Sequence, residues 1–151
     1  MHEFYWPVRV YHEDTDGGGI VYYANYLKFM ERARTEYLRE MGVEQTDLLE
    51  QHRCLMVVKN VTVNYIRPAV FNDRLLVTCE PASVKRASFV VRQQVIRVTA
   101  GSNQHEDREV VQGTSDTVLV DGQVMLATLA ADTLTATRIP APVLSVLQPS
   151  G

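Results

Sequence analysis

The stretch YYANYLKFMERARTEYLREMG, residues 22–42, carries the strongest structural signal in the chain. Its apolar residues recur every three or four positions, which is the spacing of one face of an α-helix: they are Tyr26, Phe29, Met30, Ala33, Tyr37 and Met41. Gly42 suits the left-handed position that follows a helix end, and Arg39 suits the negative helix pole. We therefore expect one long helix over Tyr22–Met41. Its first half is apolar on almost every side, so we expect that half to be buried all round and the second half to meet water.

The segments around this helix follow a period of two instead. A short strand is expected over Val8–His12, before the helix, and a short amphipathic helix over Gln45–Gln51, after it. Further strands are expected at 59–65, 74–80 and 88–98, an exposed loop at 100–109, and two strands joined by a tight turn within 116–132. Asp121-Gly122 is the expected turn, because Asp-Gly is typical of two-residue hairpins.

One long helix with no helical partner of similar length needs another apolar surface to cover it. A curved antiparallel sheet wrapped around the helix would provide that surface. The pattern predicts an α+β fold, with residues 1–151 forming a single domain.

Composition excludes several classes of function. The net charge of −3 gives no indication of nucleic acid or an anionic membrane as a partner. No apolar run approaches the roughly 20 residues that span a bilayer, and the first residues do not resemble a signal peptide. The two cysteines, Cys54 and Cys79, have no CxxC spacing, which favours a reduced setting. We expect a cytoplasmic protein.

The sequence HEDTDGGG, residues 12–19, places carboxylates and three glycines directly before the helix. Asp14 and Asp16 begin like a calcium-binding EF-hand loop, but the ligands at its fifth and twelfth positions are missing. A phosphate loop would need a Lys-Ser/Thr after the glycines. No metal site is expected.

Two interpretations of this loop remain open. It can be an ordinary turn, since Asp and Gly are favoured turn residues. It can also be catalytic: the glycines leave space for a substrate carbonyl to reach a carboxylate and the free N–H groups of the helix start, which stabilise an oxyanion. A carboxylate is ionised at neutral pH and can attack the carbonyl or activate water.

The sequence from Tyr11 to Gly42 resembles the hotdog-fold acyl-CoA thioesterases of the 4-hydroxybenzoyl-CoA thioesterase superfamily, and in particular the subgroup encoded with the bacterial Tol-Pal system. The family pattern is roughly D-x-D-x-x-G-x-V-[YW]-[HY]-x-x-Y followed by E-R-A-R. The positions that fit are Asp14, Asp16, Gly19, Val21, Tyr22, Tyr23, Tyr26 and 31–34. The resemblance implies an antiparallel sheet around one long helix, and homodimers or homotetramers with active sites at the subunit interface.

The resemblance also implies roles for individual residues. Asp16 would be the catalytic nucleophile or general base, and a backbone N–H at Tyr23 would polarise the thioester carbonyl. The Tol-Pal subgroup commonly has His at this position, whereas 4-hydroxybenzoyl-CoA thioesterases have Tyr. Gly19 and Val21 would lie at the substrate.

The segment SVKRASF, residues 83–89, matches the place where related enzymes hold the phosphates of CoA, so Lys85, Arg86 and Ser88 are the expected contacts. Arg138 is a further candidate for the nucleotide. Residues 99–115 form an apparent insertion relative to the subgroup.

The expected function is hydrolysis of an acyl-CoA to a free acid and CoA, with no cofactor, since CoA is part of the substrate. Acyl carrier protein is an alternative carrier. A non-catalytic acyl-binding or cell-envelope interaction module of the same fold is the second hypothesis, although it would not need Asp16. A hydratase or dehydratase would normally pair His with an acid, and position 23 has no His.

Overall fold

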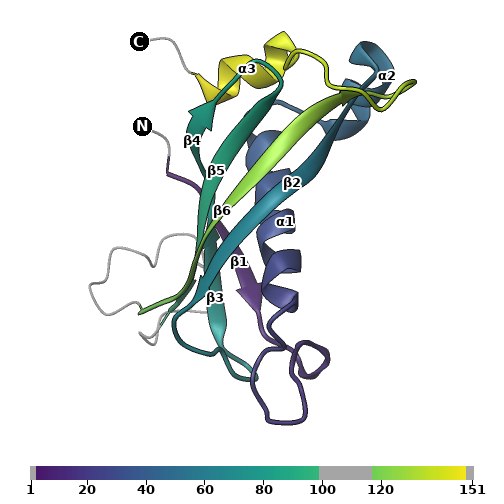
Figure 1. Ribbon diagram of the computed structural model, residues 1–151. Helices are drawn as coiled ribbons and strands as arrows, with labels where there is room; N and C mark the ends of the chain where they lie inside the picture. The colour runs from purple at the N-terminus through teal and green to yellow at the C-terminus, as the bar shows by residue number, and fades with distance from the viewer. Residues whose placement is uncertain (1–2, 99–116, 149–151) are drawn as a thin grey trace.

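The computed structural model describes residues 3–98 and 117–148, in which a curved antiparallel sheet wraps around one side of a long helix (Figure 1). The sheet order is β1-β3-β5-β6-β2, and β4 pairs with β5. The strands are β1 (Tyr5–Arg9), β2 (Cys54–Tyr65), β3 (Arg74–Thr78), β4 (Glu80–Val84), β5 (Ser88–Arg97) and β6 (Thr117–Ala130). The predicted α+β architecture is confirmed. The expected loop 100–109 and the apparent insertion 99–115 lie outside the described residues.

The long helix α1 covers Asn25–Glu40, so the predicted helix is confirmed with a later start. It ends as expected: Gly42 has a φ of +91°, and the N–H of Val43 donates to the Leu38 carbonyl over 2.8 Å. This pair of features is the Schellman cap, in which glycine avoids the cost of the left-handed conformation.

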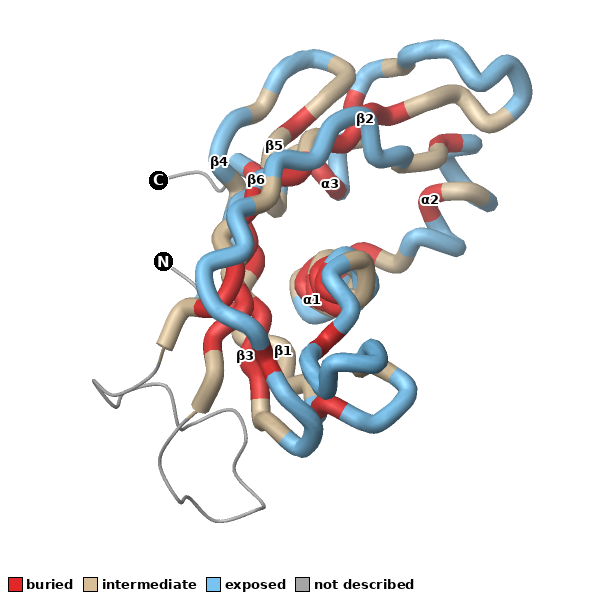
Figure 2. The backbone as a smooth tube through the Cα atoms, turned by 60° about the horizontal axis from the view of Figure 1, so that its bottom comes forward, coloured by how far each residue is buried: buried red, intermediate tan, exposed pale blue. Residues whose placement is uncertain are grey.

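The expectation that the first half of α1 is buried all round is wrong for the chain by itself. Leu27 is 39% exposed and Lys28 is exposed as well, whereas Phe29 and Met30 are buried. The sheet covers only one side of α1 (Figure 2), so the apolar stripe continues along one face of the whole helix. Each large side chain buried on that face contributes about 1.5–3 kcal/mol.

The first strand runs over Tyr5–Arg9 instead of Val8–His12 and includes Pro7. Proline has no N–H to donate and is accommodated because β1 is an edge strand with one unpaired side. The chain leaves the strand before His12, and residues 12–14 form a short 3-10 turn.

The predicted turn at Asp121-Gly122 is wrong, because β6 continues through both residues. Gly122 pairs with Val63 on one side and Gln93 on the other. A Cβ at this position would lie 3.1 Å from the Met30 methyl carbon and 3.1 Å from the Thr62 carbonyl oxygen. Glycine is therefore needed here for close packing of helix and sheet rather than for a turn.

The remaining elements close the far end of the sheet. Helix α2 (Gln45–His52) agrees with the predicted amphipathic segment. Helix α3 (Ala141–Leu147) was not predicted, although Pro140 and Pro142 at its start and the apolar spacing of Val143 and Leu147 were available signals. In the part of the chain that the structure describes, no helix has the length and apolar character needed to cross a membrane.

Candidate active site

Residues 15–21 form a small hairpin before α1, at the bottom of Figure 1. The N–H of Asp16 donates to the Ile20 carbonyl over 2.8 Å, and the N–H of Gly19 donates back to the Asp16 carbonyl over 3.1 Å. Gly19 has a φ of +82°, so a side chain there would be strained. At Gly17, by contrast, a Cβ would meet nothing within 4 Å. The hairpin thus requires one glycine for its backbone and leaves open space at another.

The carboxylate of Asp16 uses one oxygen for this hairpin. Its Oδ1 accepts the N–H of Gly18 over 2.7 Å, which is an Asx turn. No described residue donates a hydrogen bond to Oδ2, and Asp16 is exposed. The turn and catalytic interpretations are therefore compatible, because one oxygen orients the group while the other stays available.

Asp14 has a different, structural part in the same loop. Its Oδ2 accepts the N–H of Tyr11 over 2.8 Å. Its carbonyl oxygen accepts the N–H of Tyr22 and the side-chain amide of Asn25, each over 2.9 Å. These bonds attach the loop to the start of α1, a role that we did not assign from the sequence. Among the described residues, no group of three or more His, Cys, Asp or Glu side chains is placed to hold a metal ion.

Tyr23 lies two residues before the first residue of α1. The backbone N–H groups of Tyr23 and Ala24 donate to no acceptor within the described residues, and they lie at the positive end of the helix dipole. The Tyr65 hydroxyl donates to the Tyr23 carbonyl over 3.2 Å. Partial burial, and then the neighbouring Tyr23, raise the pKa of Tyr65, so its hydroxyl keeps the proton that it donates. Tyr65 is a supporting residue that the sequence analysis missed, since nothing local to β2 indicates it.

Val21 differs from the exposed loop residues before it. It is only 3% exposed, belongs to the core, and its N–H donates to the Ala69 carbonyl over 2.9 Å. Any effect of Val21 on substrate binding is therefore indirect, through the position of the loop.

Lys85 and Arg86 lie exposed in the turn between β4 and β5. The N–H of Lys85 donates to the Ser88 carbonyl over 2.8 Å, which closes the turn. The N–H of Ile139 donates to the Arg86 carbonyl over 2.9 Å, so the exposed Arg138 joins the same region. We call Lys85, Arg86 and Arg138 the basic corner.

The basic corner and the Asp16 loop lie at opposite ends of the sheet. Tyr65, which contacts Tyr23, pairs with Val120, whereas Ser88 pairs with Ala127, seven residues further along β6. At about 3.3 Å per residue this is a separation of about 23 Å. One chain by itself does not bring these expected site residues together.

Comparison with known proteins identifies the family. The model of the thioesterase superfamily matches residues 18–102. The acyl-CoA thioesterase YbgC of Haemophilus influenzae is 48% identical over 96 residues, which are 64% of this chain and 71% of that protein.

Solved structures share the fold. The 4-hydroxybenzoyl-CoA thioesterase from Pseudomonas sp. strain CBS-3 superposes with a TM-score of 0.82 at 19% identity, covering 97% of this chain and 99% of that one. A probable thioesterase from Bartonella henselae superposes with a TM-score of 0.74 at 28% identity, covering 92% and 100%. The expected hotdog fold is confirmed, and the chain belongs to the thioesterase superfamily.

Proposed function

We propose that this protein hydrolyses acyl-CoA thioesters to a free carboxylic acid and CoA, with Asp16 as the catalytic carboxylate. One observation carries the assignment of the site: the Oδ2 of Asp16 and the N–H groups of Tyr23 and Ala24 have no hydrogen-bond partner among the described residues, and all lie in the short segment before α1. The identity of 48% over 96 residues to an acyl-CoA thioesterase supports the reaction class.

Two routes use the same groups. As a general base, Asp16 removes a proton from water, and the resulting hydroxide adds to the thioester carbonyl carbon. As a nucleophile, Asp16 adds to that carbon itself and forms a mixed anhydride, which water then cleaves. In both routes the carbon–sulfur bond breaks and CoA leaves as a thiolate that takes up a proton. The N–H groups of Tyr23 and Ala24 would hold the negative charge that develops on the carbonyl oxygen.

The basic corner is proposed to bind the phosphates of CoA, with the charge of Lys85 and Arg86 supporting this role. Because these residues lie about 23 Å along the sheet from the Asp16 loop, we propose that a complete site combines the Asp16 loop of one protomer with the basic corner of another.

The edge strand β2 supports such an arrangement. It is twelve residues long, lies at the edge of the sheet, and exposes Val57, Val58 and Val61. A long apolar edge strand is normally covered by a partner. Two copies of β2 related by a twofold axis would run antiparallel, so the Tyr65 end of one would meet the Cys54 end of the other. Since Cys54 pairs with Ala130, that end is also the end of the basic corner, and we propose a homodimer or homotetramer.

The carrier and the compartment are further proposals. An acyl group on acyl carrier protein presents the same thioester as an acyl-CoA. The two carriers, CoA and acyl carrier protein, differ only in the groups that the basic corner would contact. A reduced, cytoplasmic setting is supported by the two buried free cysteines, Cys54 and Cys79.

The deciding experiment measures free thiol released from short, long and aromatic acyl-CoAs by the wild type and Asp16→Asn. We expect kcat to fall by about 10²–10⁴ in Asp16→Asn, because the amide cannot act as a base or nucleophile. Glu13→Gln is the matched control, since it removes a neighbouring exposed carboxylate and should leave kcat unchanged. Equal thiol release by wild type and a folded Asp16→Asn would refute the role of Asp16. Absence of release from every substrate would favour a non-catalytic acyl-binding module.

A further inference from the structure

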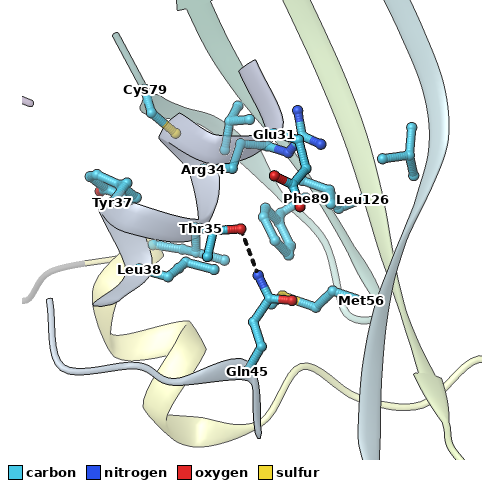
Figure 3. Close-up of a pocket in the computed structure, with 13 residues that line it drawn as sticks. Glu31, Arg34, Thr35, Tyr37, Leu38, Gln45, Met56, Cys79, Phe89 and Leu126 are labelled. Carbon is cyan, nitrogen blue, oxygen red and sulfur yellow. Dashed lines mark hydrogen bonds between the residues drawn. The ribbon is translucent and has the colours of Figure 1, made fainter. Parts of the chain in front are cut away.

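A cavity of about 140 Å³ lies between the C-terminal half of α1 and the concave face of the sheet. Most of its wall is apolar, and Figure 3 shows Met56, Phe89 and Leu126 from the sheet across from Leu38 of α1. The cavity lies toward the basic corner and away from the Asp16 loop of the same chain, because Phe89 pairs with Leu126 near the start of β5.

Two charged side chains of α1, Glu31 and Arg34, line this cavity, and Arg34 is the one largely removed from water. Burial lowers the pKa of Arg34, which is nevertheless a guanidinium that stays charged in proteins. Its Nη1 donates to Oε1 of Gln93 over 3.1 Å. Gln93 is completely buried and is itself held by donating to the carbonyls of Met30 and Thr78 over 2.9 and 3.2 Å. The cation is therefore held in place by a rigid neutral amide.

The only carboxylate near Arg34 among the described residues is the exposed Glu31, which raises the pKa of Arg34 less than burial lowers it. None of the ion pairs among residues 3–98 and 117–148 includes Arg34. The neighbouring Cys79 thiol does not supply a negative charge, since burial raises the pKa of Cys79 to about 12 and keeps it neutral. A cation in an apolar setting is costly unless an anion pairs with it. Arg34 has five N–H donors, of which Gln93 takes one.

The size of the cavity limits what can enter. An engineered apolar cavity of about 150 Å³ binds benzene, whereas sites for drug-sized ligands are about 300–1,000 Å³. An aromatic ring or a chain of about six carbons therefore fits, and a nucleotide does not.

We propose that this cavity binds a small apolar carboxylic acid, with its carboxylate on Arg34 and its ring or short chain against Met56, Phe89 and Leu126. A guanidinium and a carboxylate form two parallel hydrogen bonds, which matches the free donors of Arg34. The ligand belongs to the same chemical class as the acid that the proposed hydrolysis releases, and to that extent the proposal rests on the proposed function.

Glu31 is the group that opposes an anion here. It lines the cavity but is exposed, so water and salt screen its charge more than that of Arg34. We therefore expect opposite effects of the two charges on binding of the acid. Removing the charge of Glu31 should strengthen binding, and removing the charge of Arg34 should weaken binding.

The test measures binding of benzoate and hexanoate to the folded wild-type protein by calorimetry, with benzyl alcohol as the neutral match. It contains no thioester, so its result is independent of whether Asp16 hydrolyses one. We expect benzoate to bind at least tenfold more tightly than benzyl alcohol. Arg34→Gln should weaken benzoate binding at least tenfold, Arg34→Lys less, and Glu31→Gln should strengthen it. Arg32→Gln, an exposed arginine on the same helix, is the matched control and should have no effect.

The position of the ligand is measured in the wild type. The proposal can therefore be tested even if a variant fails to fold. With methionine methyl groups labelled for NMR, benzoate should shift the Met56 resonance through its ring current. Met125, next to Leu126 on β6 but directed to the opposite face of the sheet, should not move. Equal affinity for benzoate and benzyl alcohol, or a Met56 resonance that benzoate leaves in place, would overturn the proposal.

Discussion

The two ends of α1 hold charged groups in opposite ways. At the N-terminal end, Asp16 is exposed, and its position comes from hydrogen bonds within a glycine-rich hairpin. In the C-terminal half of α1, Arg34 is largely buried, and its position comes from Gln93, which donates to the carbonyls of Met30 and Thr78. A carboxylate in water stays ionised and accessible for chemistry, whereas a cation removed from water creates a demand for an anion. Asp16, before the start of α1, is thus available to react, and Arg34, on α1, is placed to bind an anion.

The largest effect on stability is expected at alkaline pH, from Cys79, which lines the same cavity as Arg34. The pKa of this thiol is raised by burial from 9.0 to about 12 in the folded protein. Below the unfolded pKa both states hold the proton, so the stability does not change with pH through this thiol. As the pH rises above the unfolded pKa, the unfolded state loses its proton first. The free energy of unfolding should therefore fall by about 1.4 kcal/mol per pH unit.

Urea unfolding from about pH 8 to about pH 11 measures this effect by comparison with Cys79→Ala. The variant starts less stable, because it loses buried volume, but its curve should be flatter than that of the wild type. Parallel curves would show that ionisation of Cys79 does not cause the loss of stability. Water would then reach the cavity lined by Arg34 and Cys79.

Packing between the two ends is tested by Gly122→Ala. The added methyl group would lie 3.1 Å from both the Met30 methyl carbon and the Thr62 carbonyl oxygen. We expect a loss of about 1–3 kcal/mol in the free energy of unfolding, as for other overpacked core positions. If thermal unfolding detects no change, α1 can move away from β6 at no cost, and its two ends would be less rigidly connected.

The exposed end is tested by a pair of glycine substitutions. Gly19→Ala should cost about 1–2 kcal/mol, because its φ of +82° lies in the left-handed region. It should also lower kcat by displacing Asp16. Gly17→Ala is the control, since its Cβ meets no atom within 4 Å and its φ is not in that region. Equal loss of stability in both variants would mean that the hairpin tolerates neither side chain, irrespective of backbone conformation.

The smallest effect on stability is expected from Tyr65→Phe. It removes the hydrogen bond to the Tyr23 carbonyl, and an exposed bond of this kind contributes about 0.5–1.5 kcal/mol at most. Because the Tyr23 peptide is proposed to hold the oxyanion, kcat should fall several-fold while KM changes little. Tyr5→Phe is the comparison variant, because it also removes an exposed hydroxyl hydrogen bond of 3.2 Å, to Glu3, away from the Tyr23 peptide. A change in KM alone would indicate that Tyr65 contacts the substrate and does not position the Tyr23 peptide.

Local patterns in the sequence predicted much of the fold. The long helix, its stop at Gly42 and the antiparallel strands follow from spacing and glycine position, which act over a few residues. The errors are at positions where distant contacts decide the local structure. Asp121-Gly122 has the composition of a turn, but Met30 and the β2 backbone pack against it and require glycine within a strand.

The candidate site divides in the same way. The sequence by itself determined that Asp16 precedes a helix start among glycines, because side-chain type and backbone freedom are local properties. Only the tertiary structure decided that Asp14 is structural, that the basic corner lies at the other end of the sheet, and that Arg34 is removed from water. Loss of water depends on atoms from strands and helices far apart in the chain, and no spacing within one segment encodes it.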